Sequence, residues 1–463
     1  MEATFLIIGG GIAGISCAET LSYLEPDQKI ILISESSLIK TAVNLQVLTK
    51  LLTTFDVQEK ETSSLTESHP NIIVVSDRLT QVCNTENTVK TASGQNYSYK
   101  YLCICTGAYP KLIPQADMFR NYIVGIRDTD SVETFTKKLQ IAKKVVIVGN
   151  GGIASEVIHK IRNVEVHWII KDKHISATFV DPGAAEFFLS SIQEIKKDDP
   201  KPCKRMRFKI EDSKKSGAAL GPDWYENLEI YGSSKATPRD IKIHYQTEIS
   251  KIVMSEGNQY PIEVILINDE VIPCDLIISA TGVLPATNFE LSSDIKLSED
   301  GGILVNEFMQ SSVSNIYAAG DVCTANWQLA KHWFQMKLWT QARQMGCFAA
   351  KSMAAAFARE EIYQDFCFEM FTHSTKLFGY KVILLGLFNG QTLGTNYEIL
   401  LRMTKGLEYI KFVLENNRLQ GAVLIGDTDL EEMCENLILN QIDLSPFGED
   451  ILNPNIDIED YFD

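Results

Sequence analysis

An α/β fold built on two parallel sheets, followed by a smaller α+β domain, is predicted by three features of this 463-residue sequence. Over residues 5–34, an apolar run that ends in glycines, a helical stretch and a second apolar run form the pattern of one βαβ unit. The same order returns over residues 144–171. The third feature is a set of strand-like runs without crossover helices, before a helix that begins near residue 429. These runs are 381–387, 409–414 and 421–425.

The composition is that of an ordinary soluble protein, with 45% hydrophobic and 22% charged residues. No apolar stretch is long enough to span a bilayer. Glycines interrupt the first apolar run and no basic segment precedes it, so we expect neither a membrane span nor a secretory leader. The ten cysteines are irregularly spaced, which favours free thiols in a reducing compartment. We therefore expect a cytoplasmic and nuclear protein.

Charge is unevenly distributed along the chain, whose net charge is −17. Residues 427–463 contain twelve acidic residues and no Lys or Arg, and this acidic end would repel nucleic-acid phosphates. Direct nucleic-acid binding is therefore not expected. Residues 196–215 are basic instead, within a stretch from 183 to 242 where the strand and helix patterns break down. We interpret 183–242 as a surface insertion.

The first glycine motif, Gly9-x-Gly11-x-x-Gly14, stands between the first strand and the first helix, as a dinucleotide-binding turn requires. Gly9 permits the tight turn, Gly11 lets the backbone approach a pyrophosphate, and Gly14 lets helix and strand pack closely. Free N–H groups at the helix start then bind phosphate. Glu35 ends the second strand, where a carboxylate accepts hydrogen bonds from ribose hydroxyls.

The second motif, Gly149-x-Gly151-x-x-Ala154, has alanine in its third place, which the fingerprint allows. Its second strand ends in Lys171 and Asp172, side by side. A carboxylate at this point favours NAD, whereas a cation accepts the 2′-phosphate of NADP. The sequence leaves the choice between NADH and NADPH open, with NADPH or dual use favoured. Two such motifs predict two Rossmann-like domains, one for each of two dinucleotides.

Four further segments resemble those of a known family. Residues 106–110 and 280–285 resemble the paired turns where the chain passes between two nucleotide-binding domains. Residues 315–321 resemble the segment whose aspartate holds the ribityl chain of FAD, and 126–130 resemble one that places an arginine beside the cofactor. Together with the glycine motifs, they make the sequence similar to the pyridine nucleotide-disulphide oxidoreductases, flavoproteins with one FAD domain and one NAD(P)H domain.

This resemblance implies three domains. They are an FAD-binding domain formed by 1–115 and 285–360, an NAD(P)H-binding domain over 116–284 with the insertion 183–242, and a C-terminal α+β domain over 361–463 with an acidic tail. A helix near the flavin is expected to begin within 324–346.

The resemblance also implies the site residues. The expected FAD-binding residues are Gly9, Gly11, Ile12, Ala13, Gly14, Glu35, Lys40, Val82, Thr106, Gly107, Arg127, Gly320 and Asp321. The expected NAD(P)H-binding residues are Gly149, Gly151, Ile153, Ala154, Lys171 and Gly282. Glu156, two residues beyond Ala154 on the same helix, is the expected catalytic residue beside the nicotinamide. No metal site is expected.

The chain departs from the family pattern where a redox disulphide should stand. Residues 40–47, after the first ribose-binding acid, contain no cysteine, and no Cys-x-x-Cys pair occurs anywhere in the sequence. The terminal domain also lacks the His-Pro pair of disulphide reductases. A disulphide between Cys103 and Cys105 on one strand would be strained, so we interpret both as packing residues. Cations beside Cys203 would favour its thiolate, although an incidental exposed thiol is the simpler interpretation.

Two functions fit these features. In the first, hydride passes from NAD(P)H to FAD, and electrons leave to oxygen, a quinone or an external protein instead of an internal dithiol. In the second, the protein is a flavoprotein binding module whose nucleotide state governs a partner. Similarity to one subgroup of the family, carried by 219–224, 339–346 and 455–463, implies an oxidation-sensitive metalloenzyme such as a tRNA ligase as that partner. The sequence defines neither the acceptor nor the oligomeric state.

Overall fold

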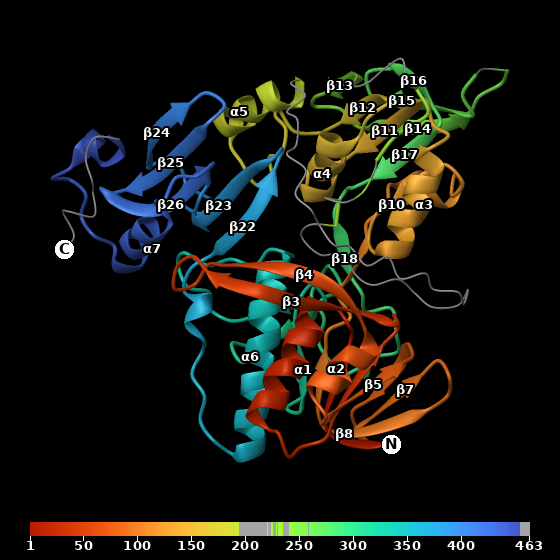
Figure 1. Ribbon diagram of the computed structural model, residues 1–463, viewed down its shortest axis with the longest axis vertical. Helices are drawn as coiled ribbons and strands as arrows, with labels where there is room; N and C mark the ends of the chain where they lie inside the picture. The colour runs from red at the N-terminus through yellow and green to blue at the C-terminus, as the bar shows by residue number, and fades with distance from the viewer. Residues whose placement is uncertain are drawn as a thin grey trace.

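The computed structural model describes residues 1–193, 220, 224–225, 228, 230–234, 240–257 and 259–453. Three sheet-based units surround a common centre (Figure 1): the N-terminal unit lies at the bottom, the second unit at the upper right and the C-terminal sheet at the upper left. The predicted α/β class with a terminal α+β unit is confirmed. Among the helices described, none is long and apolar enough to cross a membrane.

The N-terminal unit contains a seven-stranded sheet whose central strands are parallel. In spatial order its strands are β5 (Ile72–Ser76), β2 (Ile30–Ser34), β1 (Glu2–Ile8), β8 (Asn96–Ile104), β7 (Thr88–Thr91) and β6 (Leu79–Cys83), with β20 (Ile316–Ala318) paired to β8. Strand β1 is a continuous apolar run because both faces of a parallel sheet are covered.

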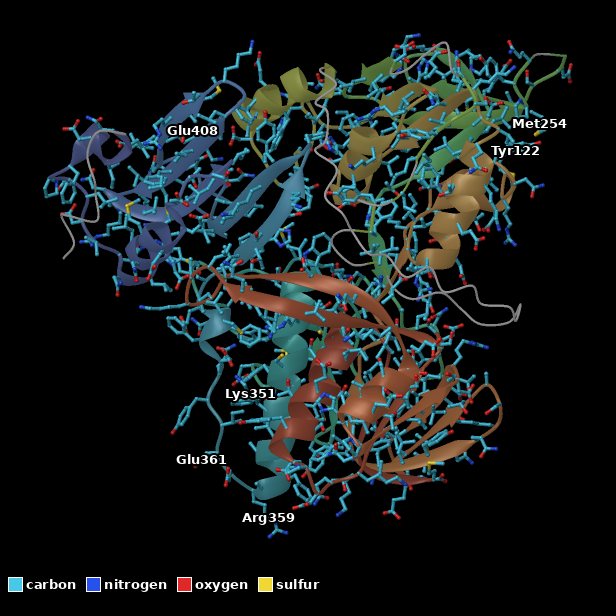
Figure 2. All side chains as sticks on the ribbon, in the orientation of Figure 1. Tyr122, Met254, Lys351, Arg359, Glu361 and Glu408 are labelled. Atoms are coloured by element: carbon cyan, nitrogen blue, oxygen red, sulfur yellow. The ribbon has the colours of Figure 1, made fainter. Side chains whose placement is uncertain are left out.

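Helices α1 (Ile12–Leu24) and α6 (Trp339–Ala358) lie side by side in this unit. Gly346 marks their contact, because a Cβ there would overlap the backbone of Ala13. Helix α6 begins within the range expected for a helix near the flavin. It ends at Ala358, and the C-cap residue Arg359 has a left-handed backbone. Figure 2 shows Lys351 along α6 and Arg359 just beyond it.

The second unit repeats the plan with a five-stranded parallel sheet. In spatial order its strands are β10 (Ile123–Gly125), β17 (Leu276–Ser279), β11 (Lys144–Val148), β12 (Glu165–Ile169) and β13 (Asp240–His244), accompanied by α3 (Thr129–Leu139) and α4 (Gly152–Lys160). A separate antiparallel sheet contains β14 (Ile249–Met254), β15 (Ile262–Leu266) and β16 (Val271–Cys274). The chain enters and leaves the second unit through β9 (Ala108–Pro110) and β18 (Val283–Pro285), which pair with each other.

The C-terminal unit is a five-stranded antiparallel sheet with one helix on its face. In spatial order its strands are β22 (Thr372–Leu377), β23 (Tyr380–Gly386), β26 (Arg418–Ile425), β25 (Glu408–Glu415) and β24 (Glu398–Thr404), and its helix is α7 (Glu431–Asn440). The three predicted strand runs and the helix near 429 are confirmed. Strands β22 and β24 are the two edge strands, and the sequence did not predict them.

A β-hairpin occupies the stretch where the family pattern would place its redox cysteines. Its strands are β3 (Leu38–Val47) and β4 (Thr53–Glu61). Leu51 and Leu52, at its turn, are buried in the core of the C-terminal unit, so the hairpin joins the first unit to the third. The remaining elements are α2 (Thr62–Ser68), β19 (Ile303–Val305), β21 (Cys323–Ala325) and the 3-10 helices Pro114–Asp117, Phe366–Phe368 and Gly448–Leu452.

Helix α5 (Pro182–Gln193) joins the second unit to the C-terminal sheet. It occupies the start of the segment expected to be a surface insertion, and here the structure differs from that expectation. Phe187 and Phe188 are buried, and both rings lie against the ring of Tyr380 on β23. These aromatic contacts place the second unit and the C-terminal sheet in one continuous hydrophobic core. Their partners lie almost two hundred residues away in sequence, so local pattern could not reveal them.

A buried ion pair reinforces the same junction. Lys411 on β25, only 2% exposed, lies 2.6 Å from the carboxylate of Asp181, which directly precedes α5. The hydroxyl of Tyr409 donates to the other carboxylate oxygen at 2.9 Å, and the ammonium of Lys411 also donates to Asn389 at 2.7 Å. The pair is therefore held by several hydrogen bonds, as a buried pair requires.

Replacing Lys411 with Met is expected to lower the free energy of unfolding by about 3 kcal/mol, because it leaves the partly buried Asp181 carboxylate without its cation. Chemical denaturation followed by circular dichroism measures the change. The control is Lys331→Met, which breaks an exposed ion pair with Glu415 and is expected to cost less than about 1 kcal/mol. Equal stability of the two variants would contradict the role given to the buried pair.

Candidate functional site

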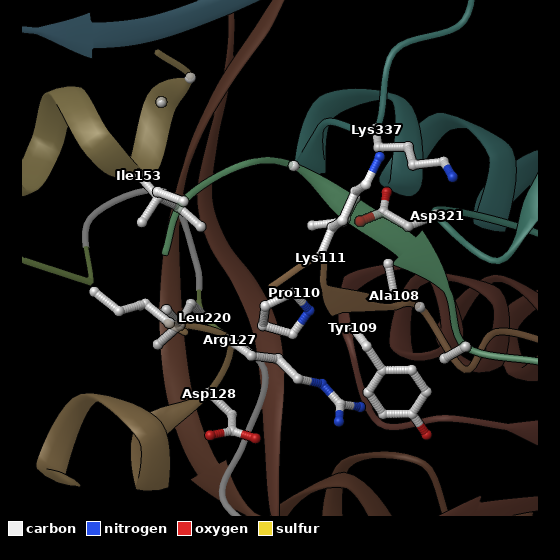
Figure 3. A pocket seen from close by; sticks show the side chains of 18 of the residues that line it. Ala108, Tyr109, Pro110, Lys111, Arg127, Asp128, Ile153, Leu220, Asp321 and Lys337 are labelled. Atoms are coloured by element: carbon white, nitrogen blue, oxygen red, sulfur yellow. The ribbon is translucent and has the colours of Figure 1, made fainter. Parts of the chain in front are cut away.

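A cavity of about 1020 Å³ lies where the three units meet. Its walls include the residues after β1 and β11, the starts of α1, α4 and α6, and part of β22. Open parallel sheets bind ligands at this position, beyond the carboxyl ends of their strands. Figure 3 shows Asp321 and Lys337 of the first unit on one side of the cavity, with Ile153 and Leu220 on the other.

The first glycine turn is fixed by a close approach of two backbones. Gly9 has φ +121°, and a Cβ at this position would overlap the carbonyl group of Cys105 at the end of β8. A Cβ at Gly14 would in turn overlap the carbonyl of Gly9. Gly11 is the N-cap of α1, and no side chain caps this helix. Its first N–H groups can therefore bind an anionic ligand.

The second glycine turn has the same geometry. Gly149 has φ +124°, and a Cβ there would overlap the carbonyl group of Ala280, after β17. Gly151 is the N-cap of α4, again without a side-chain cap. The two turns thus present two uncapped helix starts to one cavity.

Most of the predicted site residues line the cavity. They are Gly9, Gly11, Ile12, Ala13, Glu35, Thr106, Gly107, Arg127, Gly320, Asp321, Gly149, Gly151, Ile153, Glu156, Lys171 and Gly282. Gly14 and Ala154 pack behind the turns, as the third position of each motif requires.

Lys40 and Val82 are not among the residues that line the cavity. The ammonium of Lys40 lies 2.7 Å from the carboxylate of Glu59 on β4. The backbone N–H of Val82 donates to the carbonyl of Glu290 at 2.8 Å. Both groups therefore have protein partners in this structure, and their contact with a cofactor stays a prediction from the resemblance.

Asp321 presents a carboxylate to the cavity without a hydrogen-bond donor among the described residues. Burial raises the pKa of Asp321 to about 6, and the nearby charge of Lys337 opposes this shift. Gly320 has φ +80°, and a Cβ there would lie 2.9 Å from the Cβ of Ala13, so this turn is pressed against the start of α1. A ligand that supplies hydroxyl donors at this point would satisfy the carboxylate.

Arg127 stacks on an aromatic ring at the junction of the two nucleotide-binding units. Its guanidinium lies 4.1 Å from the centre of the Tyr109 ring. Figure 3 shows the two side chains beside each other. The backbone N–H of Arg127 donates to Ser131, whose own N–H donates to the Asp128 carboxylate in the capping box of α3. The cap fixes the backbone at Arg127, and the cation–π contact directs its charge along the cavity wall.

Comparison with known proteins identifies the family. Residues 3–194 and 228–346 match the model of the pyridine nucleotide-disulphide oxidoreductases. The chain belongs to this family. Residues 373–442 match the rubredoxin NAD+ reductase C-terminal domain.

Two full-length relatives are named pyridine nucleotide-disulfide oxidoreductase domain-containing protein 1. The Drosophila melanogaster relative is 51% identical, with 100% of this chain and 99% of the relative covered. The Homo sapiens relative is 46% identical, with coverage of 99% and 98%.

Solved structures share the fold at low identity. A covalent putidaredoxin reductase–putidaredoxin complex aligns with a TM-score of 0.68 at 17% identity, covering 98% of this chain and 96% of that chain. The ferredoxin reductase of the CYP199A2 system from Rhodopseudomonas palustris gives 0.64 at 18% identity, with 91% of each chain covered.

The pyridine nucleotide-disulphide oxidoreductases and these structural neighbours are FAD- and NAD(P)H-dependent reductases. The residues of the first turn fit FAD. The uncapped start of α1 suits a pyrophosphate. Glu35 follows β2 at the position of a ribose-binding acid. The Asp321 carboxylate lines the cavity and can accept hydrogen bonds from the hydroxyl groups of a ligand. The second turn fits the pyrophosphate of a nicotinamide coenzyme in the same way.

Glu156 has a partner that the sequence did not predict. The indole Nε1–H of Trp224 donates to the Oε2 atom of Glu156 at 2.7 Å, and both residues line the cavity. Burial raises the pKa of Glu156 to about 7, and the hydrogen bond from Trp224 opposes this shift. The unusual motif 219–224 drew attention to this part of the sequence. A sequence motif does not reveal, however, that Trp224 contacts Glu156.

The C-terminal unit also contributes to the cavity, through His373, Thr375 and Leu377 on β22. The hydroxyl of Thr340 lies 3.0 Å from Nδ1 of His373, and burial lowers the pKa of this histidine to about 3. His373 is therefore neutral at physiological pH. The residues of edge strand β22 show little apolar alternation, so the sequence did not predict that this strand lines the cavity.

Two cysteines on one strand and just after it, Cys103 and Cys105, occupy packing positions. Cys103 and Cys105 are free and buried, with their sulfur atoms 3.5 Å apart, as expected for packing residues. Cys203 lies outside the described residues. Within the part of the chain that the structure describes, no cluster of three or more His, Cys, Asp or Glu residues could hold a metal ion.

Matched alanine substitutions in the two glycine turns should affect FAD binding and NADP+ binding separately. Gly9→Ala introduces a Cβ that overlaps Cys105, so the purified protein is expected to lose most of its FAD absorbance. Gly149→Ala is expected to retain FAD but to bind NADP+ at least about tenfold more weakly by titration calorimetry. Unchanged NADP+ affinity of Gly149→Ala would contradict the assignment of the second turn.

Proposed function

We propose that the protein is an FAD-dependent NAD(P)H oxidoreductase that reduces an external acceptor. The observation that carries this proposal is that both glycine turns border one cavity, so dinucleotides held at the two turns would share one space. The family and the fold of the chain support it. Hydride transfer requires the two rings to lie together in one space, shielded from water when the ligands are bound.

The protein groups in this proposal bind, orient and shield. Backbone N–H groups at the starts of α1 and α4 hold the two pyrophosphates, and Glu35 and Asp321 accept hydrogen bonds from sugar-type hydroxyls. FAD, when bound, supplies the chemistry of hydride acceptance. The cavity wall formed by the C-terminal unit, which includes His373, shields the reacting rings of the two dinucleotides from water.

Glu156 is the group that we place beside the nicotinamide. A carboxylate at this point stabilises the positive charge that develops on the nicotinamide ring as hydride leaves. The enclosed position of Glu156, only 5% exposed, strengthens this interaction because the surroundings are of low dielectric. Since the pKa of Glu156 is raised to about 7, the carboxylate form is lost as pH falls through neutrality.

The placement of Lys171 favours NADPH over NADH as the coenzyme. Lys171 and Asp172 both line the cavity after β12. The Asp172 carboxylate already accepts a hydrogen bond from Asn150 Nδ2 at 2.9 Å, whereas Lys171 has no ion-pair partner among the described residues. The ammonium of Lys171 is thus the group available for a 2′-phosphate.

The electrons must leave the protein by a route other than an internal dithiol, because residues 40–47 form a hairpin strand without cysteine. We propose oxygen, a quinone or a protein as the acceptor. One solved structure with this fold is a complex of putidaredoxin reductase with putidaredoxin, which supports a protein acceptor as one of these classes.

A nucleotide-gated binding role remains the alternative proposal. An oxidation-sensitive partner such as a tRNA ligase, and residence in the cytoplasm and nucleus, stay predictions from the sequence. A pull-down with and without NAD(P)H measures partner binding, and a partner retained equally under both conditions would exclude gating by the nucleotide.

Anaerobic mixing of the flavin-loaded protein with NADPH or NADH is expected to bleach the flavin absorbance, because hydride is transferred inside the shared cavity. Stopped-flow spectrophotometry measures the rate, and a second mixing step with oxygen reports reoxidation. A flavin spectrum unchanged by either coenzyme would refute the oxidoreductase proposal.

Lys171→Ala is expected to raise the KM for NADPH about tenfold and to leave that for NADH within about twofold, because it removes a charge-assisted contact to the 2′-phosphate. Lys173→Ala is the matched control, since Lys173 is exposed and is not among the residues that line the cavity. A parallel change for both coenzymes would show that Lys171 does not select between them.

A further inference from the structure

Trp224 connects the segment between α5 and β13 to the catalytic cavity. It is 4% exposed, and its neighbour Tyr225 is 6% exposed, with the two rings in an edge-to-face contact at 5.9 Å. Both residues belong to the hydrophobic core of the second unit. The backbone N–H of Leu220, ahead of them in the chain, donates to the carbonyl of Arg127 at 3.3 Å. Leu220, Trp224 and Tyr225 thus contact the second unit at separate points.

The contact between Trp224 and Glu156 is directional. The indole has one N–H group, and it donates to Oε2 of Glu156 at 2.7 Å, a short distance typical of a hydrogen bond to a charged acceptor. An indole can only donate, so it stabilises the ionised carboxylate more than the protonated form. Among the described residues, no donor is bonded to the Oε1 atom of Glu156, which leaves this oxygen for a ligand in the cavity.

Other charged groups lie on the surrounding walls but do not contact Glu156. They include the charged residues Arg127, Asp128, Lys171, Asp172, Asp321 and Lys337 and the neutral His373 on β22. His159 and Lys160 lie at the far end of α4, outside the cavity lining. Within the described chain none of them is hydrogen-bonded to Glu156, and burial and Trp224 are the two influences on its ionisation. The indole is therefore the specific contact that offsets the cost of burying the charge.

We propose that Trp224 is a positioning residue whose indole N–H holds the Glu156 carboxylate ionised and fixed in orientation beside the second glycine turn. This inference rests on the proposed function, because the fixed carboxylate acts on the nicotinamide coenzyme. Through this one hydrogen bond, Trp224 sets the pH range in which flavin reduction is fast, without itself supplying a reacting group.

The variant Trp224→Phe tests this inference, because it keeps an aromatic ring and removes the donor. The rate of flavin reduction by NADPH is expected to rise with pH around neutrality in the wild type, with the ionisation of Glu156. In Trp224→Phe the midpoint is expected to move to higher pH by about one unit, because a hydrogen bond to a charged group is lost. Tyr225→Phe, on the same segment but outside the cavity lining, should keep the wild-type midpoint.

A double variant separates positioning from packing. Glu156→Gln is expected to remove the pH dependence near neutrality, and adding Trp224→Phe to it should then have no further effect on the pH profile. A Trp224→Phe protein that contains full FAD and keeps the wild-type midpoint would overturn the proposal, and so would an equal shift in both backgrounds.

Indole NMR provides a readout that needs neither coenzyme turnover nor a stable Trp224 variant. Of the five tryptophan indole N–H signals, one is expected to shift with pH around neutrality in the wild-type holoprotein and to stay constant in Glu156→Gln. Absence of such a signal would refute the contact itself. If the signal titrates but no coenzyme reduces the flavin, the contact stands and the proposed function fails.

Discussion

Two glycine turns, each pressed against the carbonyl group of another strand, determine where the rest of the site lies. Gly9 approaches Cys105 and Gly149 approaches Ala280, and neither contact leaves room for a Cβ. Each carbonyl is followed directly by a Thr-Gly pair, 106–107 or 281–282, from which the chain passes through β9 or β18 between the units. The turn geometry therefore fixes two helix starts and the two crossovers together.

The third unit adds a further wall to the cavity between the first two units. Aromatic residues of α5 and the ion pair of Asp181 with Lys411 hold the C-terminal sheet against the second unit, and β22 then forms part of the cavity wall. Burial of the titratable side chains along the cavity has a direct electrostatic consequence. It raises the pKa values of Glu156 and Asp321 and lowers that of His373, because each charged form loses contact with water.

Residues 40–47, which contain no cysteine, have a structural role in this protein. Where the family pattern has its cysteines, the chain forms the hairpin of β3 and β4, whose turn residues are buried in the core of the C-terminal unit. This stretch serves as a structural link between units. In the proposed reaction, hydride transfer therefore depends on carboxylate placement and on the shape of the cavity, and an external molecule takes the electrons.

The sequence by itself determined the two βαβ units, their glycine turns and three strands of the C-terminal sheet. It also predicted that Asp321 belongs to the site, and this residue lines the cavity. These features follow from local rules, because apolar periodicity and turn glycines act within one element. The tertiary structure alone decided that Lys40 pairs with Glu59, that Phe187 and Phe188 are buried, and that Trp224 meets Glu156 across 68 positions. A sequence pattern shows which face of an element is apolar, but the surface that covers this face comes from distant parts of the chain.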